Sequence, residues 1–189
     1  MWIIEQEATE DFQRIAGTRP DEEDYSKKSA FDLAKNRIPW LMFLMISGAF
    51  TSTILKSYED VIETVIALNM FIPMLTGSGG NAGSQASTLV IRAMATDDIE
   101  PKDWAKVVLK EISVGIICGL VLAIVAFLKC YLFDKVPINV ALVVALTIIA
   151  IVIMAKAIGS LLPIIAEKFG ADPAIMASPL ITTIVDSLG

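Results

Sequence analysis

A single carboxylate lies inside an apolar segment close to the end of the chain. Asp186 occurs in PLITTIVDSLG, 14 residues after Asp172, which corresponds to about 21 Å along a helix. If that helix starts at a membrane surface, the carboxylate lies deep in the bilayer, where it is costly unless it faces water, a cation or a paired charge. Thr182 and Thr183 can share a helical face with Asp186, and these oxygen atoms suit a hard cation. The alternative is a real C-terminus at Gly189, near which Asp186 is merely solvated.

A second polar stretch, GSGGNAGSQAS at 77–87, directly follows the apolar run VIALNMFIPMLT. An unbroken helix from 61 to 94 would measure about 51 Å, well beyond the hydrocarbon core of about 30 Å. We therefore expect a break at Pro73 or within the glycines. The stretch lacks the Lys-Ser/Thr pair of a nucleotide P-loop. We predict a close-packed, partly unwound segment, in which Asn81 and Gln85 bond exposed peptide groups or line a wet path.

The composition is that of a membrane protein. The 189 residues are 55% hydrophobic and 19% charged, with a mean hydropathy of +0.67, whereas a soluble domain carries about 25% charged residues. The net charge of -6 and the absence of histidine argue against nucleic-acid binding through a basic face. The sequence also offers no Ser/His/Asp set and no metal-ligand cluster, so we expect that the protein is not an enzyme.

Long apolar segments predict five transmembrane helices. The first four lie at about 38–55, 61–94, 107–133 and 138–165. A fifth starts after Asp172 but stops at Gly189, too short to cross, so we expect the natural protein to continue. Before the first span, Ser29 and Asp32 form an approximate capping box that begins a short amphipathic helix. The predicted fold class is an all-α polytopic membrane protein, preceded by a cytoplasmic juxtamembrane helix.

The distribution of positive charges predicts the orientation. With the N-terminus inside, nine side chains lie near the inner surface: Lys27, Lys28, Lys35, Arg37, Arg92, Lys102, Lys106, Lys110 and Lys168. Three lie near the outer surface: Lys56, Lys129 and Lys135. Because Lys and Arg concentrate in cytoplasmic loops, we predict a multi-pass protein of the cell (inner) membrane with a cytoplasmic N-terminus.

Other polar residues within the predicted spans are weaker candidates for an ion path. Lys156 could pair with an acid, but its long stem favours snorkelling of the ammonium group to the cytoplasmic interface. Glu63 and Glu111 lie near interfaces, where solvation explains them as well as function does. Asn69 lies in the second span and could line a path.

Small residues in the third span indicate packing. Gly115 and Gly119 have the small-xxx-small spacing that lets two helices approach closely. Cys118 and Cys130 lie roughly 18 Å apart along the same helix, which excludes a disulfide between them.

Several motifs together resemble the MgtE-type magnesium channel family. FIPMLTGSGGNAGSQASTLVIRAMAT is similar to the second-span motif of that family, and DPAIMASPLITTIVDSLG to the start of its fifth span. EQEATEDFQRIAG resembles the exit from its regulatory CBS domains, and SAFDLAKNRIPWL its gating helix and first span. The resemblance therefore covers nearly the whole chain, with the motifs in the right order.

The resemblance implies a homodimeric channel that conducts Mg²⁺ as both transported ion and ligand. Its pore would lie on the dimer axis, lined chiefly by the second and fifth spans, with residues 1–37 as cytoplasmic linker and plug-like gating helix and 38–189 as the transmembrane pore domain. The pore aspartate of the family falls on Asp186, and its Gly-Gly-Asn segment on Gly79, Gly80 and Asn81. The remaining pore-lining candidates are Asn69, Gln85, Thr182 and Thr183.

The sensor domains of the family have no counterpart before Met1, so we expect residues 24–37 to form an unlocked helix and the pore to be less inhibited by Mg²⁺. Two other functions are open. An ion-coupled secondary transporter would use Asp186 as an exchange group for H⁺ or Na⁺. A non-transporting scaffold would have no reason to bury an aspartate, and is the weakest alternative.

Overall fold

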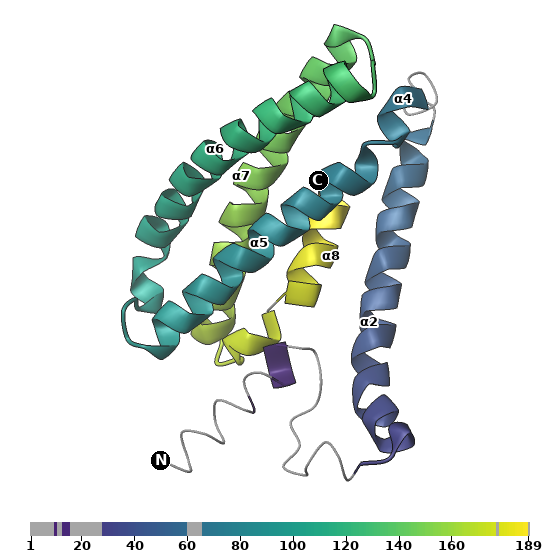
Figure 1. The fold of residues 1–189 in the computed structure, drawn as a ribbon. Coiled ribbons are helices and arrows are strands. Elements are labelled where there is room, and N and C mark those ends of the chain that lie inside the picture. Colours follow the sequence, from purple (N-terminus) through teal and green to yellow (C-terminus); the bar gives the residue numbers. More distant parts are fainter. Residues whose placement is uncertain (1–9, 11–12, 16–27, 60–65, 177, 189) are drawn as a thin grey trace.

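The computed structural model describes residues 10, 13–15, 28–59, 66–176 and 178–188, and within these ranges it contains helices and turns but no strand. The long helices are α2 (Ala30–Ser57), α5 (Ile72–Ala95), α6 (Trp104–Leu128) and α7 (Ile138–Lys168). The shorter α8 (Ser178–Leu188) follows them (Figure 1). The all-α prediction is confirmed.

α2 is one helix that continues through the boundary expected at residue 37. The Ser29 hydroxyl caps it, accepting a hydrogen bond from the Asp32 N–H at 3.2 Å and donating one to the Asp32 carboxylate at 2.5 Å. This confirms the predicted N-cap. Pro39 lies inside the helix, rather than in the first turn of a separate span. The expected juxtamembrane helix is therefore the first part of α2.

The break in the second span lies next to Pro73, as the first of the two alternatives predicted. α4 (Ile66–Asn69) ends before a turn at Met70 and Phe71, and α5 starts with Pro73 in its first turn. A proline there removes an N–H that has no helical partner in any case. Phe71 is fully buried, and it packs with Cys130, Val140, Ala141 and Val144. The turn is thereby anchored to the end of the α6–α7 pair.

α6 and α7 form an antiparallel pair, joined by the π-helix η3 (Lys129–Phe133) and a short turn. A Cβ on Gly115 would lie 3.1 Å from the Ile153 Cα, and one on Gly119 would lie 3.1 Å from the Ile149 Cα. The two helix backbones therefore approach closely along this line. Cys118 and Cys130 are free thiols, as predicted.

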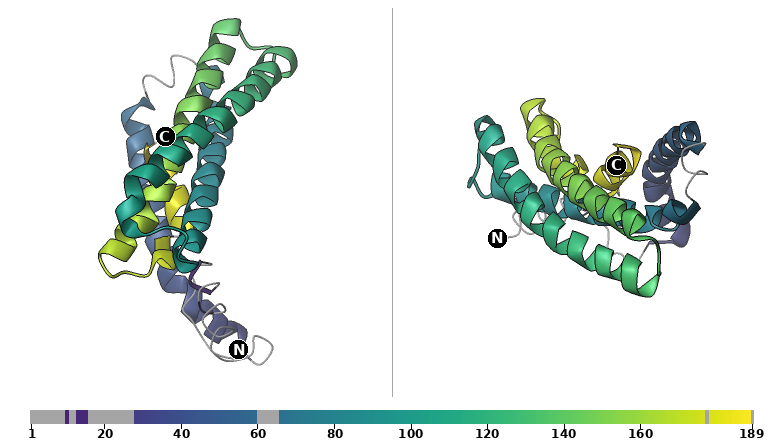
Figure 2. Two further views of the ribbon diagram at one scale, coloured as in Figure 1. Left: turned by 90° about the vertical axis from the view of Figure 1, so that its left-hand side faces the viewer. Right: turned by 90° about the horizontal axis from the view of Figure 1, so that it is seen from above.

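α8 lies between the α5–α7 pair and α2, as two views show (Figures 1 and 2). The main core joins four helices and consists of Ala82, Ala123, Ala126, Ala145, Ile148, Ile151, Val152, Ala155, Ile181 and Val185. Half of these residues are alanines, which suits close packing of helices in a membrane.

Three helical stretches in the described part of the chain are long and apolar enough to cross a membrane: Ala30–Ser57, Pro101–Phe133 and Ile138–Lys168. Their outward faces carry large apolar side chains, among them Phe50, Ile117 and Leu146, each more than 60% exposed. Such faces require a lipid environment. The chain is therefore a polytopic helical membrane protein, as its composition predicted.

Candidate ion path

The glycine-rich stretch 77–87 is not unwound. All of it lies within the regular helix α5, so the prediction of a partly unwound segment is wrong. A Cβ on Gly79 would lie 2.5 Å from the Ile151 Cγ2 atom and 2.7 Å from the Val185 Cγ1 atom. Contacts of this kind with α7 and α8 offset the low helix propensity of glycine. The glycines serve the predicted close packing, and the backbone keeps its helical hydrogen bonds.

The tightest contact of this interface joins α5 to α7. A Cβ on Gly159 would lie 2.3 Å from the Gly83 carbonyl oxygen, and one on Gly83 would lie 3.1 Å from the Ala155 carbonyl oxygen. At this point backbone meets backbone, and no side chain separates the two helices. The position of α5 is therefore fixed by backbone atoms, which cannot move aside as a flexible side chain can.

α8 packs antiparallel to α5 through one apolar face. Ile181 and Val185 are fully buried, and a Cβ on Gly80 would lie 2.9 Å from the Thr182 Cγ2 atom. Asp186 follows Val185 and is partly exposed. Because the contacts pair Gly83 with Ile181 and Gly79 with Val185, the register places Asp186 at the level of the turn just before Gly79.

The other face of α5 carries an exposed polar stripe. Asn81, Gln85 and Thr88 are exposed, and Ser84 is partly exposed; spacings of three and four residues put them on one side of the helix. Gly80 borders this stripe and contacts Thr182. The stripe of α5 therefore borders α8 at Thr182; Thr182, Thr183 and Asp186 of α8 are all partly exposed.

A hydroxyl contact fixes the opposite side of α8. Thr51 Oγ1 in α2 lies 2.6 Å from Ser187 Oγ, and the Ser187 hydroxyl donates a hydrogen bond to the Thr183 carbonyl oxygen at 2.8 Å. α8 is thus held by α2 on one side and by α5 and α7 on the other. These contacts fix the position of the helix that carries Asp186.

The predicted site residues fall into three groups. Asn81, Gln85, Thr182, Thr183 and Asp186 lie on the polar faces of α5 and α8 described above. Gly79 and Gly80 are buried in the packing of α5. Asn69 is exposed at the end of α4, outside α5. The metal role of Asp186 and the pore role of the others stay predictions.

Groups of several ligand side chains hold metal ions in proteins. Within the described ranges, no three acidic or cysteine side chains gather in a group that could hold a metal ion.

Lys156 does not snorkel, contrary to the prediction. It is only 4% exposed, and its Nζ donates a hydrogen bond to Glu111 Oε2 at 3.4 Å. The lysine lies on the buried side of α7, so its shortest route to a stabilising partner is the carboxylate of α6. The alternative that an acid pairs with Lys156 is the correct one.

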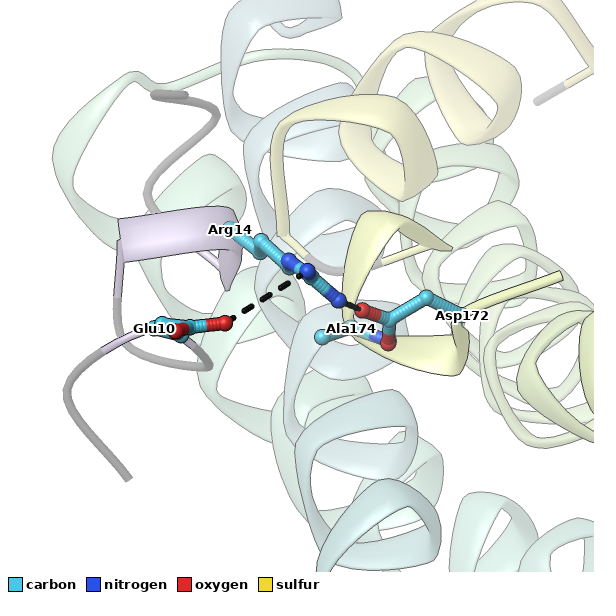
Figure 3. Close-up of polar contacts among 4 residues, drawn as sticks. All are labelled: Glu10, Arg14, Asp172 and Ala174. Carbon is cyan, nitrogen blue, oxygen red and sulfur yellow. Dashed lines mark hydrogen bonds and ion pairs between the residues drawn. The ribbon is translucent and has the colours of Figure 1, made fainter. Parts of the chain in front are cut away.

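An ion pair also links residues 13–15 to the turn before α8 (Figure 3). The Arg14 guanidinium contacts the Asp172 carboxylate and lies 3.7 Å from that of Glu10. Asp172 Oδ1 also accepts a hydrogen bond from the Ala174 N–H at 2.8 Å, so Asp172 caps the short 3-10 helix η4 (Pro173–Met176) that precedes α8. Sequence reasoning missed Arg14, because no local pattern connects residues 158 positions apart.

Comparisons with known proteins identify relatives along the whole chain. The family model MgtE, described as a divalent cation transporter, matches residues 72–189. The magnesium transporter MgtE of Thermus thermophilus is 38% identical over 187 residues, which cover 99% of this chain and 41% of that protein. The proteins of the same name from Bacillus subtilis and Enterococcus faecalis are 32% and 29% identical, covering 98% and 97% of this chain and 41% and 40% of theirs. The chain thus spans about two fifths of the length of these relatives.

Proposed function

The chain belongs to the MgtE family of divalent cation transporters, and we propose that it forms a passive channel for Mg²⁺. Membership of a transporter family agrees with the prediction that the protein is not an enzyme. The observation that carries the proposal is the partly exposed Asp186 on α8, the helix whose Thr182 contacts Gly80 at the border of the polar stripe of α5. In a membrane helix, a carboxylate beside exposed amides and hydroxyls is costly unless it meets water or a cation.

The proposed pore lies on a two-fold axis between two copies of the chain. Each copy offers one Asp186, so the axis would bring two carboxylates together, flanked by the hydroxyls of Thr182 and Thr183. Mg²⁺ gives up its water reluctantly, and such a ring of oxygens can hold it through its hydration shell. Two carboxylates so close repel each other when the site is empty, and this repulsion raises the free energy of the empty site and favours binding of a divalent ion.

A homodimer also accounts for the exposed polar stripe of α5. Asn81, Gln85 and Thr88 would otherwise face lipid, where their polar groups find no partner. On the dimer axis they would line a water-filled path. We accordingly propose residues 38–189 as the pore domain and residues 1–37 as linker and gating helix.

The proposed orientation has a cytoplasmic N-terminus in the cell (inner) membrane. The excess of Lys and Arg on that side supports it. The contact between Arg14 and Asp172 is consistent with this topology, because it requires residues 13–15 and the turn before α8 to lie on the same side.

The test is Mg²⁺ uptake into liposomes by the full chain and by Asp186→Asn, which keeps the size and removes the charge. We expect uptake to fall at least about a hundredfold, since one misplaced or missing interaction at an ion site is worth several kcal/mol. Asp98→Asn is the matched control, because Asp98 is exposed in the turn after α5. Equal uptake by the parent and Asp186→Asn would refute the role of Asp186.

The runner-up function is an ion-coupled secondary transporter of divalent cations. It predicts that a pH or Na⁺ gradient drives Mg²⁺ against its own gradient, whereas a channel only dissipates it. Uphill uptake in such liposomes would replace the channel with the transporter. Chemical cross-linking of the chain in the membrane tests the proposed dimer separately: a dimer gives a cross-linked pair, and this pair should disappear when the chain is diluted in detergent before the reaction.

A further inference from the structure

A buried ion pair joins α6 to α7 one turn away from the glycine contact. The side chains of Lys156 and Glu111 are 5% and 14% exposed, and their charged atoms lie 3.4 Å apart. We propose that this pair is a positioning device, which fixes the rotation of α7 and thereby the spacing of α5 and α8 along the proposed ion path. The inference rests on the proposed function only for its effect on transport.

Lys156 occupies the position on α7 next to the residues that touch α5. Ala155 is fully buried, and its carbonyl oxygen faces Gly83. Gly159, three residues after Lys156, meets the Gly83 carbonyl oxygen. Successive helix positions differ by about 100°, so α7 presents the ammonium group to α6 and its smallest residues to α5 at the same level. Rotation of α7 would disturb both contacts together.

The glycine contacts of α7 with α5 and α6 set how closely these helices approach. The ion pair adds a directional contact between α7 and α6, which is lost if α7 rotates. A lysine buried at this depth has only two low-energy positions, beside a carboxylate or at the membrane interface. Glu111 supplies the first position. A buried pair of this kind gives specificity of register more readily than net stability.

Substitutions of Glu111 and Lys156 can separate an effect on the position of α7 from an effect on the stability of the fold. Removing one partner leaves an unpaired buried charge and is expected to unfold the site. Removing both, in Glu111→Gln/Lys156→Met, leaves no unpaired charge, so the chain folds while α7 loses its rotational lock. Exchanging them, in Glu111→Lys/Lys156→Glu, restores the lock. The exposed pair of Glu100 and Lys102, 2.7 Å apart, provides the control Glu100→Gln/Lys102→Met.

The proposed measurement is the labelling rate of a cysteine introduced at position 87, which does not depend on ion transport. Ser87 is fully buried on α5, one turn after Gly83, and Ser87→Cys is nearly isosteric. With Cys118→Ala and Cys130→Ala as background, N-ethylmaleimide labels the detergent-solubilised full chain, and thermal unfolding verifies that each variant is folded. We expect the neutral pair to be labelled about tenfold faster than the parent, and the exchanged pair and the control to be labelled at the parent rate.

A second variant keeps both charges. Glu111→Asp withdraws the carboxylate by one methylene, and we expect intermediate labelling. Parent-like labelling of both the neutral pair and Glu111→Asp would overturn the proposal. In liposomes, the neutral pair should raise the KM for Mg²⁺ several-fold, whereas a loss of folded protein lowers only the maximal rate. If the neutral pair is labelled faster but the parent chain does not transport Mg²⁺, the positioning role stands and the channel is refuted. If the parent chain conducts Mg²⁺ but the neutral pair is labelled at the parent rate, the channel stands and the positioning role is refuted.

Discussion

The backbones of α5 and α7 touch at Gly83 and Gly159: a Cβ on Gly159 would lie 2.3 Å from the Gly83 carbonyl oxygen. Because that atom belongs to a helix backbone, it cannot move aside as a flexible side chain does. The two helices must separate if either residue gains a side chain. This contact sets the position of the helix that carries the polar stripe.

The first prediction concerns this contact. Gly159→Ala should destabilise the folded chain by about 1–3 kcal/mol, the range of overpacked cores. Gly48→Ala is the matched control, since a Cβ on Gly48 in α2 meets nothing within 4 Å and alanine is the better helix former. Thermal unfolding in detergent measures both variants. A melting temperature unchanged by Gly159→Ala would contradict the close approach.

The second prediction concerns the ion pair of Arg14 and Asp172. Arg14→Gln and Asp172→Asn should show a coupling of about 0.5–1 kcal/mol in a double-mutant cycle, because both side chains are partly exposed, at 35% and 23%, and are screened by water. Asparagine keeps the oxygen that accepts from the Ala174 N–H, so the cap survives. The coupling should shrink as salt is added. Strictly additive effects at low salt would show that the pair contributes nothing.

The third prediction concerns the hydroxyls that join α2 to α8. Thr51→Val removes the partner of Ser187 and should cost about 0.6 kcal/mol, a typical value for a hydrogen bond between membrane helices. Thr53→Val is the control, because the Thr53 hydroxyl donates within its own helix, to the Ala49 carbonyl oxygen at 3.0 Å. Unfolding in detergent compares the two. Equal losses would mean that the contact between helices adds nothing.

The fourth prediction concerns the start of α2. Ser29→Ala removes the capping oxygen and should destabilise the first turn by about 1 kcal/mol. Hydrogen exchange at residues 31–34 should quicken about fivefold. Ser52→Ala, which loses a bond to the Gly48 carbonyl oxygen within the helix, should leave that exchange unchanged. Unaltered exchange in Ser29→Ala would show that the turn does not depend on its cap.

Local signals predicted the elements well. Ser29 was predicted to start a helix and Pro73 to mark a break, and both do so in the structure; Asp172, after which the fifth span was expected to start, caps the short 3-10 helix before α8. The effect of such a residue on a helix start depends on residues within four positions of it, and these can be read from the sequence. Long apolar segments likewise predicted the three stretches of the described chain that are apolar enough to cross a membrane, whereas α5 and α8, where the second and fifth spans were expected, are not among those three.

Contacts between distant residues were harder to predict. The stretch 77–87 was predicted to be both close-packed and partly unwound; its contacts with Ile151 and Val185 show the packing, but the stretch lies within a regular helix. Lys156 indicated either snorkelling or pairing, and the choice depends on the face of α7 that meets α6. Asp186 was singled out from its place in an apolar segment and from the family resemblance, and its role as an ion ligand stays a prediction. Thr51, which contacts its helix, gave no signal in the sequence.

The glycine face of α5 also has a consequence for biosynthesis. α5 is not among the three stretches, within the described residues, that are apolar enough to cross a membrane unaided, and its polar stripe makes spontaneous insertion unfavourable. Ile151 and Val185, which cover its glycines, are translated later. The insertion machinery must therefore retain α5, or leave it at the membrane surface, until α7 emerges. Of the four long helices, we expect α5 to be the last to settle in the bilayer.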